Sequence, residues 1–151
     1  MTPLQIILVI YGLIGLALLW LGIFHLTAYL SGWKLLALEF QETNPFIGTE
    51  VLLWHARMRS LAKYDLVIYM GADAQGLHLR VNLLFRIAHP PLLIPWSEVS
   101  IGPESRGLFF IPVTVLLLGR ESQIPLKIWG WKARNLLQAS PIAEKTPLAI
   151  N

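Results

Sequence analysis

The sequence predicts an α+β protein, in which an N-terminal transmembrane helix is followed by a small antiparallel β-roll or barrel closed by a C-terminal helix. Two observations favour this class. Apolar residues make up 55% of the 151-residue chain, and no Asp, Glu, Lys or Arg precedes Lys34, as is typical of a membrane span. After Pro45 the apolar residues recur at every second position, which is the period of a half-buried strand, until a helical period returns near the C-terminus.

The first segment, residues 1–32, is expected to cross a membrane once. Its continuous apolar run, residues 4–30, would form a helix about 40 Å long. That length exceeds the ~30 Å hydrocarbon core of a bilayer, so the helix can span it with some tilt. Trp33 and Lys34 stand where an interfacial aromatic ring and a snorkelling amine are expected. A cleavable signal peptide is the alternative, although a basic start and an A-x-A site are both missing.

The basic residues after the span predict the side of the membrane on which the domain lies. Lys34, Arg57, Arg59 and Lys63 follow the span, whereas only the α-amino group precedes it. By the positive-inside rule, the C-terminal domain then lies in the cytoplasm. We therefore expect a single-pass protein of the cytoplasmic membrane.

Small residues on one face of the span suggest a place for a second helix. Gly12, Gly15 and Gly22 fall within an arc of about 80° on a helix, and such a face lets another helix approach closely. No pair has GxxxG spacing, and glycine is common in membrane helices, so a helix without a partner is the alternative. His25, the only ionisable side chain of the span, lies near its end, where it can reach interfacial water.

A juxtamembrane amphipathic helix is expected at residues 33–45. Trp33, Leu36 and Phe40 share one helical face, and Pro45 ends the helix because the residue before a proline disfavours the helical conformation. This helix would either lie along the membrane surface or pack under the domain.

A β-rich domain is predicted for residues 46–140. Its strands are expected at residues 50–59, 64–70, 77–87, 92–99, 108–118 and 123–129, with a turn at residues 102–107. Residues 131–140 are expected to form the closing helix, with Ala133, Leu136 and Leu137 on its inner face. Because Pro141 stops this helix, residues 141–151 are expected to be a disordered tail.

Two resemblances follow from these patterns. The order of elements resembles a pleckstrin-homology-like or GRAM-like roll, a likeness of architecture that implies no functional residue. The block HPPLLIPWS, which begins at His89, is the distinctive part of a pattern that also includes Trp54, Met58 and Phe85. This pattern resembles a family of small, uncharacterised bacterial proteins that carry the same block after a hydrophobic segment. The resemblance implies a bacterial inner membrane and no particular activity.

Patterns typical of enzymes and metal sites are missing from the sequence. It contains no Cys, no GxSxG, no HExxH and no Gly-rich phosphate loop. His55, His78 and His89 belong to different predicted elements, so neither a catalytic nor a metal site is expected, and no cofactor. The net charge of +3 is weaker than that of most nucleic-acid binders, so no nucleic-acid partner is expected.

A candidate surface for a protein partner or lipid comprises Arg57, Arg59, Arg80, Arg86, His89 and Trp96. Its arginines lie on the polar faces of predicted strands and would form a basic patch if those strands were neighbours. Such a patch would attract anionic lipid; an ordinary solvated sheet face is the alternative. Two interpretations also remain for the His89–Trp96 block: it recognises a partner, or its prolines shape a strand crossing with the tryptophan in the core.

The sequence therefore predicts a membrane-anchored binding or scaffold module that recruits a protein partner and contacts anionic lipid. The alternative is an accessory subunit of a membrane complex, held through its transmembrane helix. An enzyme is not expected, because no residue pattern supports one.

Overall fold

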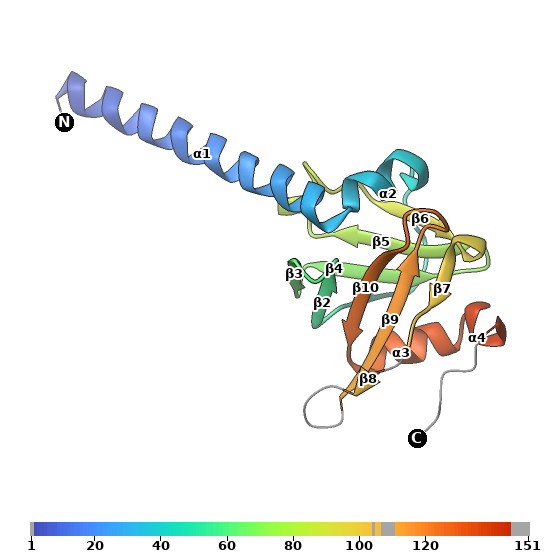
Figure 1. Cartoon of the computed structure of the whole chain (residues 1–151). Coiled ribbons are helices and arrows are strands. Elements are labelled where there is room, and N and C mark those ends of the chain that lie inside the picture. Colours follow the sequence, from blue (N-terminus) through green and yellow to red (C-terminus); the bar gives the residue numbers. More distant parts are fainter. Residues whose placement is uncertain (1, 104, 107–110, 146–151) are drawn as a thin grey trace.

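The N-terminal helix α1 (Pro3–Ser31) projects from the rest of the molecule in the computed structural model, which describes residues 2–103, 105–106 and 111–145 (Figure 1). The Thr2 hydroxyl accepts from the Gln5 amide at 3.4 Å, while the Gln5 side chain accepts from the Thr2 amide at 2.8 Å. This reciprocal cap, with Pro3 at the first helical position, fixes the start of the helix. By length and composition α1 could span a membrane, and a signal sequence would have the same properties.

A sharp corner joins α1 to the domain. Gly32, with a φ of 83°, ends α1 and begins α2 (Trp33–Phe40). Trp33 and Leu36 are 0% and 1% exposed, so α2 packs into the domain. The predicted helix at residues 33–45 ends early, because Gln41 forms an isolated β-bridge with Leu92 and the chain continues in extended form.

Two antiparallel sheets form the body of the domain (Figure 1). The first sheet contains, in spatial order, β1 (Glu50–Leu52), β4 (Ile68–Ala72), β5 (Gly76–Val81) and β6 (Leu92–Pro95). The second contains β3 (Ala62–Asp65), β2 (His55–Met58), β10 (Ile124–Trp129), β9 (Pro112–Leu118) and β7 (Val99–Ile101), with β8 (Ser105–Arg106) paired to β9. The predicted α+β class is confirmed, but the strands that the structure describes form no closed barrel.

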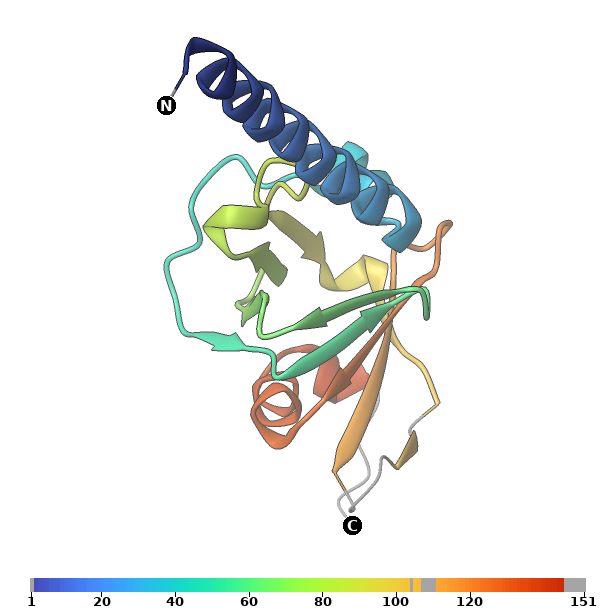
Figure 2. The same cartoon turned by 90° about the vertical axis from the view of Figure 1, so that its left-hand side faces the viewer.

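The core is shared by both sheets and the helices. Buried residues of α2, the two sheets and the C-terminal helix α3 (Trp131–Gln138) form one cluster. The helix α3 lies against β1, β4 and β9, and its predicted inner residues Ala133 and Leu137 are 3% and 0% exposed. Figure 2 shows α3 on the side of the sheets away from α1. A further short helix, α4 (Ile142–Lys145), buries Ile142, so part of the expected disordered tail is helical; residues 146–151 lie outside the described residues.

Several predicted strands are broken by turns. The segment 50–59 divides into β1 and β2, which belong to different sheets, and the segment 64–70 divides at Leu66, which has a φ of 55°. The predicted strand 77–87 ends at Val81, because the Asn82 side chain accepts from the Leu84 amide at 3.3 Å and caps the short 3-10 helix η1 (Leu83–Phe85). The alternation of apolar residues continues past this turn, but the strand does not.

Two more strands are shorter than expected. The segment 92–99 contains β6, the 3-10 helix η2 (Trp96–Glu98) and the start of β7. The segment 108–118 contains β9, while its residues 108–110 lie outside the described residues. The turn expected at residues 102–107 includes the two-residue strand β8, and residues 104 and 107 lie outside the described part.

Candidate functional site

A cleft of about 420 Å³ opens between the linker after α2, strand β5 and the turn η1. Seven of its eleven lining residues are charged or polar: Glu42, Thr43, Asn44, Glu50, His78, Arg80 and Arg86. Pro45, Phe46, Leu79 and Pro91 supply the apolar part. A mixed lining of this kind is typical of a binding site, in which apolar area gives affinity and a few polar groups fix orientation.

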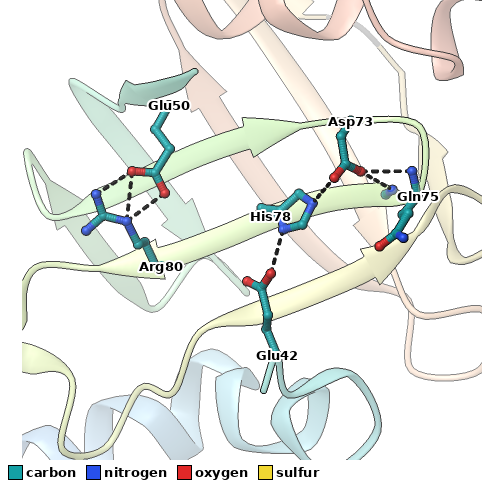
Figure 3. A network of polar contacts seen from close by, with 7 residues as sticks. Glu42, Glu50, Asp73, Gln75, His78 and Arg80 are labelled. Carbon is teal, nitrogen blue, oxygen red and sulfur yellow. Dashed lines mark hydrogen bonds and ion pairs between the residues drawn. The ribbon is translucent and has the colours of Figure 1, made fainter. Parts of the chain in front are cut away.

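His78 joins three segments of the chain at the back of the cleft (Figure 3). Its side chain is buried, with Nδ1 3.0 Å from Oε1 of Glu42 and Nε2 2.9 Å from Oδ2 of Asp73. An imidazole that carries both protons can donate to both carboxylates. The contact therefore ties the linker, β5 and the β4–β5 turn together.

Asp73 is positioned by the turn that it begins. Its Oδ1 accepts from the backbone amides of Gln75 and Gly76 at 2.8 and 3.0 Å (Figure 3), as expected of an Asp at the start of a tight turn. Partial burial works against ionisation, but these two hydrogen bonds and His78 outweigh it and lower the pKa of Asp73. The carboxylate is therefore held in its charged form opposite His78.

Phe46 covers His78 from the linker side. The two ring centroids are 4.0 Å apart, with the ring planes tilted by 32°. Gly71 faces His78 directly across β4 and β5, and a Cβ at Gly71 would collide with the Phe46 ring. The missing side chain at Gly71 thus creates the space in which Phe46 packs.

The remaining charges of the cleft differ in their pairing. The Arg80 Nε donates to Glu50 Oε1 and Oε2 at 2.6 and 2.8 Å, and its Nη2 also donates to Glu50 (Figure 3). The Arg80 guanidinium lies 4.2 Å from the ring centroid of Tyr69. The hydrogen bonds to Glu50 raise the pKa of Arg80. Arg86 is exposed at the rim, and within the described residues its guanidinium has no hydrogen bond or ion pair. Arg86 is therefore the cation of the cleft that is free to meet a ligand.

The predicted basic patch forms only in part. Arg80 and Arg86 line the same cleft. Arg57 and Arg59 lie in and just after β2, which belongs to the other sheet, and Arg57 lies 5.9 Å from the ring centroid of Trp129. The four arginines do not form one patch, because β2 and β5 belong to different sheets and the condition of neighbouring strands is not met.

His89 and Trp96 do not belong to a surface. Trp96 is 6% exposed and donates its indole N–H to the Asp73 carbonyl at 2.8 Å. His89 is 1% exposed, with Nε2 2.9 Å from the Tyr64 hydroxyl. Burial lowers the pKa of His89 to about 4 and raises the pKa of Tyr64 to about 12, so a neutral imidazole meets an un-ionised hydroxyl. These two positions support the interpretation in which the block shapes the core.

The glycine face of α1 is open. A Cβ at Gly12, Gly15 or Gly22 would meet nothing within 4 Å. His25 contacts its own helix, with Nδ1 2.9 Å from the Leu21 carbonyl oxygen. Outside α1, His55 pairs with Asp65 at the edge of the second sheet. No group of three residues suited to hold a metal occurs in the part of the chain that the structure describes.

Four residues of the site were not predicted from the sequence: Glu42, Phe46, Glu50 and Asp73. Only Asp73 has a local signal, the turn pattern that ends at Gly76. Glu42 and His78 are 36 positions apart, and the period of neither segment indicates that they meet.

Comparisons of the chain with family models, curated proteins and solved structures found no match. The resemblances of the HPPLLIPWS block and of the element order therefore stay predictions. Inference about function has to start from the geometry of α1 and of the cleft.

Proposed function

We propose that this protein is a single-pass membrane-anchored binding module that takes an acidic group of a protein partner into the cleft beside Arg86. The observation that carries the proposal is that the two parts of α1 differ in their surroundings. From Pro3 to Trp20 its side chains are exposed and, apart from Gln5, apolar on every side, whereas from Leu21 onward one face packs on the domain. A bilayer would cover the first part, and the domain already covers one face of the second.

The packing of the end of α1 supports a retained anchor over a cleaved signal peptide. Ala28 and Ser31 are 2% and 0% exposed, and Ala28 belongs to the same core cluster as Trp33. Cleavage near the end of α1 would remove these contacts from the domain. Large apolar side chains gain about 1.5–3 kcal/mol each on leaving water, so the exposed ones on α1 favour a bilayer strongly.

The pairing of charges supports an acidic ligand group in the cleft. Glu42 contacts His78 and Glu50 is paired with Arg80, whereas Arg86 is not neutralised by a described residue. A guanidinium binds a carboxylate with two parallel hydrogen bonds, which gives both strength and orientation. Pro45 and Pro91 then offer rigid apolar contacts for the chain that carries the carboxylate.

Affinity purification of the full-length protein from native membranes in mild detergent tests this proposal. We expect a partner in stoichiometric amount with the unchanged protein, and at least about tenfold less of it with Arg86→Glu, since a tenfold loss needs only about 1.4 kcal/mol. Lys132→Glu is the matched control, because Lys132 is exposed on α3, away from the cleft. Equal recovery with Arg86→Glu, or no partner at all, would overturn the proposal.

A second candidate function is that of an accessory subunit held through α1. The open space around Gly12, Gly15 and Gly22 supports it, because no described atom lies within 4 Å of a Cβ added at these positions, and small residues let a second helix approach closely. Gly15→Leu with Gly22→Leu should abolish co-purification, while Ala17→Leu on the opposite face should not. Unchanged recovery with the double variant would exclude this interface.

A further inference from the structure

The turn after β5 exposes a cluster of apolar side chains. Leu83, Leu84 and Ile87 are 73%, 63% and 61% exposed. The cap by Asn82 holds this turn in one conformation, so the exposure belongs to a fixed structure. We call these three side chains the η1 tip. An exposed apolar cluster on an ordered turn is a mark of an interaction surface.

The η1 tip is fixed beside α1. Phe85 of the same turn meets Phe24 of α1 edge to face, with centroids 4.8 Å apart, and Phe24 meets Trp20 at 4.3 Å. Figures 1 and 2 both show the segment between β5 and β6 next to the C-terminal part of α1. Phe24 precedes Ser31 by seven residues, so the tip lies about 10 Å from the end of the helix, measured toward its N-terminus.

That position coincides with the level at which the hydrocarbon core of a bilayer would end. The part of α1 whose side chains are exposed and, apart from Gln5, apolar on every side, residues 3–20, is about 27 Å long at 1.5 Å per residue. The hydrocarbon core is ~30 Å thick, so its boundary falls next to Leu21 or Phe24. From there on, the domain occupies one side of the helix and lipid cannot cover that side.

We infer that the η1 tip is a second membrane contact, which inserts Leu83, Leu84 and Ile87 into the headgroup and acyl-chain boundary beside α1. This inference rests on the proposed membrane anchoring. The occupant is lipid because the tip lies at the boundary level, where apolar side chains leave water without a protein partner. With two contacts to the bilayer, the whole molecule cannot turn freely about the axis of α1, and the cleft beside Arg86 stays at the membrane surface.

Site-directed spin labelling can measure the depth of the tip, since the chain has no cysteine of its own. Single variants Leu83→Cys and Leu84→Cys of the full-length protein are labelled with a nitroxide and reconstituted into phosphatidylcholine–phosphatidylglycerol vesicles. Collisions with O₂, which concentrates in lipid, are compared with collisions with a water-soluble nickel complex. Leu16→Cys in the exposed part of α1 and Gln138→Cys on α3 serve as the lipid and water references.

We expect labels at residues 83 and 84 to be more accessible to O₂ than the label at residue 138, and less accessible to nickel by about tenfold. A label at residue 83 as accessible to nickel as that at 138, with the label at 16 in lipid, would overturn the inference and leave the anchor standing. Labels at 83 and 84 shielded from both reagents would mean that protein covers the tip, which also overturns it. A label at residue 16 exposed to nickel would instead contradict the anchoring.

Discussion

Neutral His89 and the buried Tyr64 hold the loop after η1 against the corner between α1 and α2. The Tyr64 hydroxyl contacts His89, and the Trp33 indole N–H donates to the Pro90 carbonyl at 2.8 Å. Trp33 also packs edge-on against the His89 ring, with centroids 5.3 Å apart. The prolines of the block therefore act together with His89 to seat the chain on α2.

The stability of the protein should depend on the protonation of His89. Because its pKa is lowered from 6.5 to about 4 by burial, the unfolded chain binds a proton more readily than the folded one as pH falls. The contribution of neutral His89 to the free energy of unfolding is fully present above pH 6.5. It is lost as the pH falls from 6.5 toward 4, and the loss amounts to up to about 3 kcal/mol. Urea unfolding of the full-length protein in detergent between pH 7.5 and pH 4.5 measures it.

The variant His89→Gln separates this effect from other titrations. Its amide oxygen can still accept from Tyr64, but it does not titrate. We expect a lower stability at pH 7.5 and a flatter dependence on pH than in the unchanged protein. The same slope in both proteins would mean that His89 is not the group responsible.

Gly71→Ala should disturb the wall of the cleft through Phe46. The added Cβ would occupy the position of the Phe46 ring, so we expect a loss of about 1–3 kcal/mol from overpacking. Phe46→Leu should recover part of that loss when combined with Gly71→Ala, because a smaller side chain leaves room. A double-mutant cycle by urea unfolding measures the coupling, and additive effects would contradict the contact.

At the scale of elements, the corner at Gly32 sets the direction of α1 relative to the domain. Gly32→Ala should destabilise the protein for two reasons. A φ of 83° is unfavourable for alanine by about 1 kcal/mol, and the new Cβ would lie 2.7 Å from Cδ1 of Ile124. Gly12→Ala is the matched control, because it adds the same atom to open space on α1.

Urea unfolding of both variants provides the measurement. We expect a loss of more than about 1 kcal/mol for Gly32→Ala and none for Gly12→Ala, whose helix propensity improves. Equal stability of Gly32→Ala and the unchanged protein would show that the corner tolerates a side chain and does not fix the angle.

The sequence predicted elements well where one period runs without interruption. The α1, β10 and α3 segments each lie within a residue or two of their expected bounds. It failed where alternation continues through a turn. Leu83 and Ile87 keep the apolar phase of β5, yet Asn82 has already ended the strand. The chain turns at Leu66, which has a positive φ although it is not a glycine, so the sequence contains no signal for this turn. Periodicity reports which residues are apolar, not where the backbone changes direction.

The candidate site was predicted less well than the elements. Arg80 and Arg86 do share a cleft, but Arg57 and Arg59 lie in the other sheet. Glu42, Glu50 and Asp73, which contact His78 or Arg80, come from separate segments. Such contacts depend on the order of strands in space, and no local pattern encodes that order.

At the scale of the whole molecule, the apolar helix and the domain form one body. Ala28 of α1, Trp33 and Leu36 of α2 and residues of both sheets share one core cluster. The proposed anchor is thus part of the fold and does not hang from it by a linker. This continuity explains why the cleft and the η1 tip both have a defined position along α1.

The most direct test of the central proposal is the intact mass of the endogenous protein after native membranes have been washed with alkaline carbonate. A retained anchor predicts a protein in the membrane pellet whose mass includes α1, Pro3–Ser31, together with the domain. A shorter chain in the supernatant, beginning within or after residues 21–32, would contradict the proposal and identify α1 as a cleaved signal sequence.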